Sequence, residues 1–243
     1  MKNIKTSSLA ILLIGTASLS ASTVFLDFGG SVGTFQETDT GNGNFWNIVG
    51  TSTSSTSALV TSDNSASGIT YTVDAGFNGT NSGGVSSPST SLLGDLAVGQ
   101  ATADYGFVQG FIGFSNSASL TLSGLDTNAT YTFTFFGSRS ASDTRETQYQ
   151  VVGLTTESTS LTTSGTGISS NGSANYNDDT VGIIASISPN ASGEITINVG
   201  RGASGSFGYL NAMQVTTVIP EPGTYALLAG LGGMTLVAMR RRR

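Results

Sequence analysis

The stretch Thr130-Tyr-Thr-Phe-Thr-Phe-Phe136 decides the fold of this chain. Its aromatic and hydroxyl side chains alternate with a period of two, so that Tyr131, Phe133 and Phe135 share one face of an extended strand. The stretch from Ile195 to Val199 alternates in the same way, with isoleucine and valine on one face and Thr and Asn on the other. One face of each strand can be buried against a second sheet, which predicts an all-β fold.

Apolar runs separated by Ser, Thr, Gly and Asn turns recur throughout residues 23–218, and no amphipathic helix is predicted there. About ten strands are predicted, at Thr23–Phe28, Phe45–Val49, Ile69–Val73, Phe107–Phe114, Ser119–Leu122, Thr130–Phe136, Gln148–Val152, Thr180–Ile187, Glu194–Val199 and Tyr209–Thr217. This number is typical of a single jelly-roll-like β-sandwich. The polar stretches Thr51–Ser57, Asn78–Gly94 and Thr163–Asp179 are predicted to be surface loops.

Residues 1–22 have the pattern of a secretory signal peptide. Lys2 and Lys5 precede an apolar run from Leu9 to Leu19, and small residues follow that run. We therefore expect the Sec translocon and signal peptidase to act on residues 1–22, which leaves 23–218 as the exported domain.

The exported domain is strongly acidic and contains neither His nor Cys. Its three arginines face fourteen carboxylates, which gives a net charge of −11, and it contains no lysine. Nucleic acid is therefore not expected as a partner, because such binding needs a basic surface. The missing residue types exclude Ser-His-Asp triads, Cys-His dyads and the common zinc sites. No catalytic residue, cofactor or metal site is predicted.

Two alternatives to a binding protein remain open at this stage. Glycoside hydrolysis needs only a pair of carboxylates, so a carboxylate-dependent polysaccharide-active enzyme stays possible, although no pair is singled out by its context. A non-binding spacer or self-assembling matrix subunit is the other alternative. Asp178 and Asp179 could hold calcium, but they lack a spaced ligand loop and are predicted to lie in a solvated turn.

One charged constellation follows the aromatic strand and comprises Arg139, Asp143, Arg145 and Glu146. These side chains could form ion pairs that order a loop. They could instead form a ligand site, in which the guanidinium groups hold the hydroxyls or carboxylates of an acidic polysaccharide.

Two aromatic residues are further candidates. Trp46 is the lone tryptophan and could be either a sugar-stacking platform or part of the core. Tyr209 could lie in the core or on a rim. The candidate ligand-binding residues are Trp46, Arg139, Arg145, Glu146 and Tyr209.

Three parts stand in fixed order at the C-terminal end. The tripeptide Pro220-Glu221-Pro222 is followed by an uncharged apolar run, Tyr225–Met239, and then by Arg240–Arg243. The apolar run can enter a bilayer as a helix, and the arginines resist crossing and stay on the cytoplasmic side. At 1.5 Å per residue the run reaches about 23 Å, short of a ~30 Å hydrocarbon core, which favours a transient anchor.

This tail resembles the PEP-CTERM sorting signal of Gram-negative exopolysaccharide-forming bacteria. The resemblance implies that an exosortase recognises residues 219–243, with Pro220, Glu221 and Pro222 as the processing motif. It further implies a transmembrane helix at 224–239 and a cytoplasmic stop formed by Arg240, Arg241, Arg242 and Arg243. The protein would then insert transiently in the inner membrane and reach the cell surface or extracellular matrix.

The body from Gly124 onward is similar to galactose-binding-like and malectin-like jelly rolls, a group that includes carbohydrate-binding modules. The similarity rests on the order of short motifs, among them Gly137-Ser138-Arg139, Gly193-Glu194-Ile195 and Tyr209-Leu210-Asn211-Ala212-Met213. It implies glycan binding through loop aromatics. The sequence thus predicts a secreted, exosortase-processed surface or matrix protein without enzymatic activity, whose role is structural, adhesive or glycan-binding and whose partner is an extracellular polysaccharide.

Overall fold

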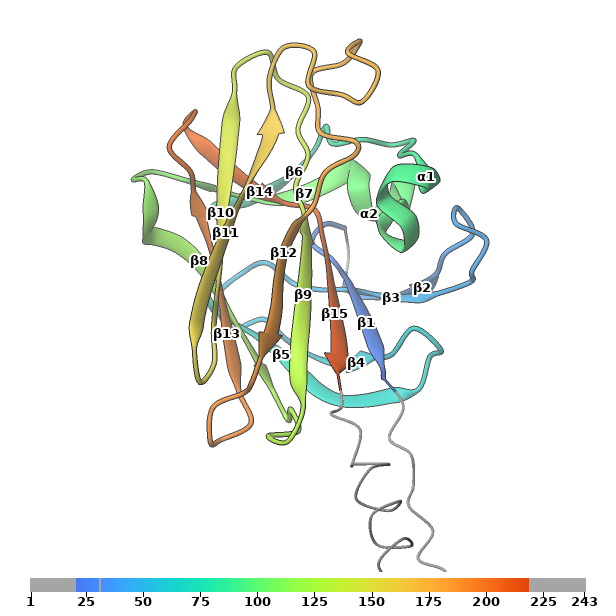
Figure 1. Ribbon diagram of the computed structural model, residues 1–243, viewed down its shortest axis with the longest axis vertical. Coiled ribbons are helices and arrows are strands. Elements are labelled where there is room, and N and C mark those ends of the chain that lie inside the picture. Colours follow the sequence, from blue (N-terminus) through green and yellow to red (C-terminus); the bar gives the residue numbers. More distant parts are fainter. Residues whose placement is uncertain (1–20, 31, 219–243) are drawn as a thin grey trace, which may run out of the picture.

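Two six-stranded sheets pack face to face, and a third, three-stranded sheet crosses one end of the sandwich (Figure 1). The structure is a computed structural model and describes residues 21–30 and 32–218. The strand orders of the large sheets are β12-β9-β15-β1-β3-β2 and β11-β10-β13-β8-β5-β4, and that of the small sheet is β14-β7-β6. The predicted all-β fold is confirmed.

The elements of the three sheets are interleaved along the chain. The first sheet contains β1 (Thr23–Asp27), β2 (Gly33–Gln36), β3 (Phe45–Ile48), β9 (Thr130–Phe136), β12 (Gly182–Ile187) and β15 (Ala212–Val218). The second contains β4 (Thr56–Val60), β5 (Ala66–Ala75), β8 (Gly113–Ser123), β10 (Arg145–Val152), β11 (Thr156–Ser164) and β13 (Ile195–Arg201). The third contains β6 (Gly79–Ser82), β7 (Asp104–Gln109) and β14 (Phe207–Leu210), and the helical turns are α1 (Thr90–Leu93), η1 (Gly94–Leu96) and α2 (Gly99–Ala103).

The main hydrophobic core lies between the two large sheets. Tyr131, Phe133 and Phe135 of β9 face into it, as their alternation predicts, and so do the apolar residues of β13. The ring of Phe135 stacks on that of Tyr149 from the opposite sheet, with centroids 4.6 Å apart and an angle of 2° between the rings. Aromatic burial of this kind contributes most of the favourable packing energy of a sandwich.

A second core covers the outer face of the first sheet. Phe25, Trp46 and Phe136 pack there against Leu96 and Val98 of the α1–α2 segment. Both faces of β1 are therefore buried, with Val24 and Leu26 in the main core and Phe25 in the second. The sequence predicted no amphipathic helix in residues 23–218, and the helices found there, of four and five residues, are too short to show an amphipathic period.

The described residues form fifteen strands rather than about ten. The strands that the sequence pattern missed are β2, β4, β6 and β11, which are short or dominated by exposed Ser and Thr and lack a continuous apolar face. The stretch Phe107–Phe114 is also divided in two, because Gly110 and Gly113 adopt φ values of 127° and 83° that turn the chain. Pattern analysis finds strands through their buried faces and loses those at solvent-exposed edges.

Both ends of the described chain leave the sandwich together. Thr23 pairs with Thr216, and Val218 pairs with Thr130 at the same end of the first sheet. The other end of this sheet is marked by the pairing of Phe136 with Ala212, six residues along β9, or roughly 20 Å away. The small sheet and the loops that carry the candidate residues lie at that far end (Figure 1).

Within residues 21–30 and 32–218, no helix is long and apolar enough to cross a membrane. The predicted transmembrane helix 224–239, the Pro220-Glu221-Pro222 motif and the arginines 240–243 lie outside the described residues, as does the predicted signal peptide up to residue 20.

Candidate functional site

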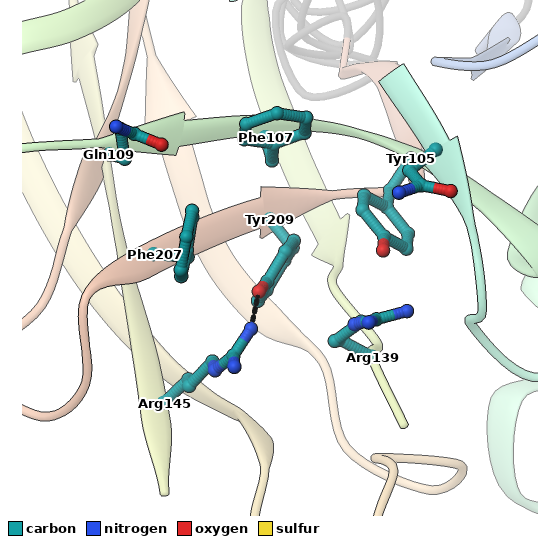
Figure 2. Close-up of a pocket in the computed structure, with 8 residues that line it drawn as sticks. Tyr105, Phe107, Gln109, Arg139, Arg145, Phe207 and Tyr209 are labelled. Carbon is teal, nitrogen blue, oxygen red and sulfur yellow. Dashed lines mark hydrogen bonds between the residues drawn. The ribbon is translucent and has the colours of Figure 1, made fainter. Parts of the chain in front are cut away.

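A pocket of about 470 Å³ lies on one face of the small sheet (Figure 2). Four aromatic rings, two amide side chains and two arginines line it: Tyr105, Phe107, Phe207, Tyr209, Asn81, Gln109, Arg139 and Arg145. Among these lining residues there is no carboxylate. The pocket therefore combines apolar ring surface with groups that donate hydrogen bonds.

Strand register brings the aromatic residues together. In the antiparallel pair β7–β14, Tyr209 lies opposite Phe107 and Phe207 lies opposite Gln109. Alternate residues of a strand share a face, so Tyr105, Phe107 and Gln109 point the same way as Phe207 and Tyr209. The glycines between them face the sandwich. A Cβ added at Gly208 would lie 2.8 Å from the Gly200 carbonyl oxygen, so glycine at this position lets the sheet approach β13 closely.

The rings form a continuous surface. Tyr105 meets Tyr209 edge-on at 4.8 Å between centroids, and Phe107 meets Phe207 edge-on at 6.0 Å. Phe207 lies nearly parallel to Tyr209, at 6.3 Å and 20°. The two tyrosines are buried, whereas Phe107 and Phe207 are half-buried and keep part of their rings open to the pocket.

Arg145 forms one wall of the pocket and makes three hydrogen bonds to the protein. Its Nε and Nη2 donate to the two carboxylate oxygens of Asp143 at 2.7 and 3.0 Å, and its Nη1 donates to the Tyr209 hydroxyl. Its guanidinium carbon lies 4.9 Å from the centre of the Phe207 ring. Hydrogen bonding to Asp143 raises the pKa of Arg145, and hydrogen bonding to Arg145 lowers the pKa of Asp143, so both groups stay charged.

Arg139 forms the other wall and has fewer partners. Its guanidinium carbon lies 5.8 Å from the centre of the Tyr105 ring, a cation–π distance, and its Nη1 makes one long contact of 3.5 Å with the Ser82 carbonyl oxygen. Among the described residues, the one salt bridge is that between Arg145 and Asp143. Arg139 therefore lies without a paired carboxylate beside the pocket.

Buried amides fix the loop that presents Arg139. The Asn211 side chain, 0% exposed, accepts the Ser138 N–H at 2.8 Å and donates to the Thr102 carbonyl at 2.8 Å. The Ser138 hydroxyl donates to the Asn177 carbonyl at 2.8 Å, and the Arg139 N–H donates to the Thr163 carbonyl at 3.0 Å. The backbone that places the guanidinium is thus bonded on several sides.

The tyrosine hydroxyls stay protonated at neutral pH. Burial raises the pKa of Tyr105 and of Tyr209 above the ordinary value of tyrosine, against the opposing effect of the nearby arginines. Beneath the pocket, the fully buried Tyr149 hydroxyl donates to the Tyr209 carbonyl at 2.6 Å, and burial raises its pKa as well. The pocket therefore presents neutral hydroxyl groups and positive charge.

The structure brings together three of the five candidate residues: Arg139, Arg145 and Tyr209 line the pocket. The prediction of Trp46 as a sugar-stacking platform is wrong, because the side chain is 0% exposed and stacks on Phe25 at 4.9 Å in the second core. Glu146 does not line the pocket. Its carboxylate accepts the Ala203 N–H at 3.0 Å, so it orders the neighbouring loop instead.

Sequence reasoning missed Phe107 and Phe207, and it left Tyr105 open between core and rim without selecting it as a candidate. A signal for them exists in the chain, since Tyr105-Gly106-Phe107 and Phe207-Gly208-Tyr209 both place two aromatic residues around one glycine. In a strand, this pattern puts both rings on one face and no side chain on the other. Neither tripeptide indicates a binding site by itself. The two form an aromatic surface because β7 and β14 pair in one sheet.

The other acidic clusters do not reach the pocket. The Asp178 carboxylate accepts the Ser170 N–H at 2.7 Å, and the Asp179 carboxylate accepts the Thr180 hydroxyl at 2.7 Å. Within the part of the chain that the structure describes, no group of three or more His, Cys, Asp or Glu side chains could hold a metal ion. Asp27 and Asp104 form a carboxyl pair, but Asp27 is 1% exposed, so a substrate has no access to it.

Comparison with protein families places a motif at the C-terminal end. Residues 218–243 match the PEP-CTERM protein-sorting motif, which confirms the resemblance stated for the tail. The motif implies processing by an exosortase and indicates export. No curated protein matches the sequence.

Comparison with solved structures finds one similar fold and two weaker matches. The plant receptor-like kinase ANX2 is 14% identical with a TM-score of 0.51, and the match covers 82% of this chain and 49% of that one. The ANXUR1 extracellular domain from Arabidopsis thaliana is 15% identical with a TM-score of 0.43, covering 81% and 48%. TmCBM61, solved with beta-1,4-galactotriose, is 16% identical with a TM-score of 0.30, covering 57% and 88%. The chain spans about half the length of the first two structures.

The likeness to ANX2 concerns the fold alone, and at this identity it assigns no ligand. Together, the comparisons show that the chain carries a PEP-CTERM protein-sorting motif at residues 218–243, behind a β-sandwich whose fold is similar to that of ANX2.

Proposed function

We propose that this protein is an exported, exosortase-processed surface or matrix protein of a Gram-negative bacterium that binds extracellular polysaccharide in the pocket on β7 and β14 and catalyses no reaction. The sorting motif supports export and processing. The aromatic pocket is the observation that carries the binding function.

The chemistry of the pocket suits a sugar ring. Phe107 and Phe207 offer ring surface on which the apolar C–H face of a pyranose can stack. The exposed amides of Asn81 and Gln109 can both donate to and accept from sugar hydroxyls. A volume of about 470 Å³ suits one or two sugar units rather than a buried cofactor.

The position of the pocket suits a protein tethered through its tail. The chain leaves the sandwich at Val218, next to Thr130, while Arg139 follows the opposite end of the same strand β9. A tail anchored in the membrane during sorting would leave the pocket pointing away from the bilayer. Polysaccharide outside the cell could then reach the pocket before and after processing.

The test uses the full-length chain in neutral detergent, with binding measured on an array of neutral and acidic bacterial and plant glycans. We expect binding that is lost in the double variant Phe107→Ala, Phe207→Ala. The matched control is Phe111→Ala, since Phe111 is 72% exposed and does not line the pocket. Thermal unfolding of each variant separates loss of binding from loss of fold.

Four results would count against the proposal. One is the absence of any binder on the array, and another is binding that survives in the double variant. Release of reducing ends from a polysaccharide would replace the proposal with the enzyme alternative. Self-association without any glycan would instead favour the spacer or matrix-subunit alternative.

A further inference from the structure

We infer that the pocket selects a sugar that carries a carboxylate, a uronate, and that Arg139 is the group that binds this carboxylate. The inference rests on the proposed glycan-binding function and names its substrate class. The supporting observations are the distribution of charge, the unequal engagement of the two arginines and the packing that holds Arg139 in place.

The distribution of charge is the first observation. Residues 23–218 contain three arginines, no lysine and fourteen carboxylates. Two of the three arginines, Arg139 and Arg145, line one pocket, and none of the fourteen carboxylates lines it. The pocket is therefore lined by positive charge in a domain whose net charge is −11. Arginine can also donate to neutral hydroxyls, but a concentration of positive charge attracts an anionic sugar more strongly than a neutral one.

The two arginines differ in how many of their N–H donors are already bonded within the protein. The Arg145 guanidinium donates hydrogen bonds to both carboxylate oxygens of Asp143 and to the Tyr209 hydroxyl. Arg139 has no carboxylate within salt-bridge distance among the described residues, and its polar contacts are one long contact with the Ser82 carbonyl oxygen and an interaction with the Tyr105 hydroxyl. A guanidinium presents five N–H donors in a planar fork that matches the two oxygens of a carboxylate. Arg139 has donors left for a ligand, whereas Arg145 shapes the wall.

The packing around Arg139 is close at Gly83. A Cβ added at Gly83 would lie 2.2 Å from Nη1 of Arg139, and Gly83 adopts a φ of 134°. The Gly83 carbonyl accepts the Ser140 N–H at 2.7 Å, which ties this glycine to the loop that carries Arg139. The Tyr105 ring covers one side of the guanidinium (Figure 2). The Arg139 guanidinium is half-buried and packed on two sides, so its orientation is restricted before a planar carboxylate binds to it.

The arrangement also supplies a place for the rest of the sugar. Figure 2 shows both arginines on one side of the aromatic rings, with Arg139 beside Tyr105 and Arg145 beside Phe207 and Tyr209. A glycan that spans the pocket can meet Arg139 with a carboxylate at the Tyr105 end, while a neighbouring sugar unit lies against Phe107 or Phe207 and bonds the amides through its hydroxyls. Binding of the carboxylate then fixes the orientation of the sugar, which ring stacking alone leaves free.

The experiment measures the affinity of the full-length chain, in neutral detergent, for three acidic trisaccharides by calorimetry. The probes are the trisaccharides from polygalacturonate, alginate and hyaluronan, each beside its carboxyl-reduced neutral form. We expect at least one acidic probe to bind roughly tenfold or more tightly than its reduced form, since a charge-assisted fork replaces neutral hydrogen bonds.

Substitution of Arg139 tests the assignment. Arg139→Gln should lower affinity for the acidic probe roughly tenfold and leave affinity for the reduced probe within about twofold, a pattern that a purely structural role would not produce. Arg139→Lys keeps the charge, loses the fork and should fall between wild type and Arg139→Gln. Arg201→Gln makes the same change in net charge outside the pocket and should leave the preference intact.

The outcomes separate this inference from the proposed function. Equal binding of the acidic and reduced forms overturns the uronate inference and leaves glycan binding standing. Equal loss of both probes in Arg139→Gln also overturns it, because Arg139 would then only support the pocket. Binding of neutral glycans on the array, with none of the six trisaccharides bound, overturns this inference alone. No binder of any kind overturns both.

Discussion

The carboxyl group of Asp27, at the end of β1, lies against that of Asp104, at the start of β7, with no cation paired to either among the described residues. Asp27 is 1% exposed, and its Oδ1 accepts the Gly29 N–H at 3.1 Å. One carboxylate oxygen of Asp104 is buried without a hydrogen-bond partner. The pair joins the first large sheet to the small sheet that carries the pocket.

This pair predicts a fold that loses stability as the pH rises. Burial, reinforced by Asp104, raises the pKa of Asp27 from 3.8 to about 8, and burial also raises the pKa of Asp104. The folded state therefore holds protons that the unfolded state releases from about pH 4 upward, so the free energy of unfolding falls between about pH 4 and pH 8.

Asp27→Asn removes the part of this dependence that comes from Asp27 and keeps an oxygen for the Gly29 N–H. We expect the variant to melt higher than wild type at pH 8 and to differ little at pH 5, measured by calorimetric unfolding. Asp126→Asn, in an exposed turn, changes the charge equally and serves as control. The same shift at both pH values, or a wild-type protein whose melting temperature rises between pH 5 and pH 8, would contradict the prediction.

Asn211→Ala is expected to destabilise the fold and disturb the pocket. The substitution leaves the Ser138 N–H and the Thr102 carbonyl unpaired in a buried site, which costs roughly 2–5 kcal/mol in free energy of unfolding. Denaturant unfolding gives the value. Asn198→Ala is the control, because its amide pairs with half-buried Gln150, and we expect less than about 1 kcal/mol there. Equal effects of the two substitutions would refute this account of Asn211.

Trp46→Ala is expected to cost about 3–5 kcal/mol in free energy of unfolding, because it empties the space between Phe25 and Phe35. The wild-type indole is buried outside the pocket, so a bound glycan should leave its fluorescence maximum and intensity unchanged. Titration with a binding glycan while recording tryptophan emission makes this check. Strong quenching by the glycan would mean that the sugar lies against Trp46 instead of in the pocket.

Asp143→Asn should leave the fold almost as stable as wild type. The Asp143 side chain is 55% exposed, and an exposed ion pair contributes about 0–1 kcal/mol to the free energy of unfolding. The substitution frees the guanidinium of Arg145 from its carboxylate. We therefore expect tighter binding of the uronate probes and unchanged binding of their reduced forms in calorimetry. Weaker binding of the acidic probes would show that the Asp143–Arg145 pair itself is needed to shape the wall.

Alanine in place of Pro220, Glu221 and Pro222 should block processing of the tail. The protein would then accumulate at full length in the inner-membrane fraction, detected by immunoblot of fractionated cells. Pro88→Ala, in the loop before α1, replaces a proline outside the motif and should be processed normally. Unchanged release of the triple variant would argue against the exosortase assignment.

Much of the fold was predictable from local patterns. The alternation in β9 and β13 predicted which faces enter the main core, because a strand with a period of two has one apolar side whatever its partners are. The predicted boundaries of β9 are those of the structure. Edge strands such as β11, rich in Ser and Thr, gave no such signal because one side faces solvent.

The candidate site was predictable only in part. The charges of Arg139 and Arg145 drew attention to their loop, since cations are rare in this domain. Nothing in the local sequence distinguished Trp46, which is in the core, from Phe207, which lines the pocket. Whether an aromatic ring is covered depends on the segment that packs over it. Trp46 is covered by the α1–α2 segment, which lies about fifty residues later in the sequence.

The sequence by itself determined the sorting tail, the all-β class and the scarcity of cations, because each depends on composition or on contiguous residues. Tertiary structure alone decided where those cations lie and which rings accompany them. Arg139 and Arg145 meet Tyr105, Phe107, Phe207 and Tyr209 only because β7 and β14, about a hundred residues apart in the chain, pair in register. Pairing between such distant strands is fixed by the packing of the whole sandwich and has no local signature.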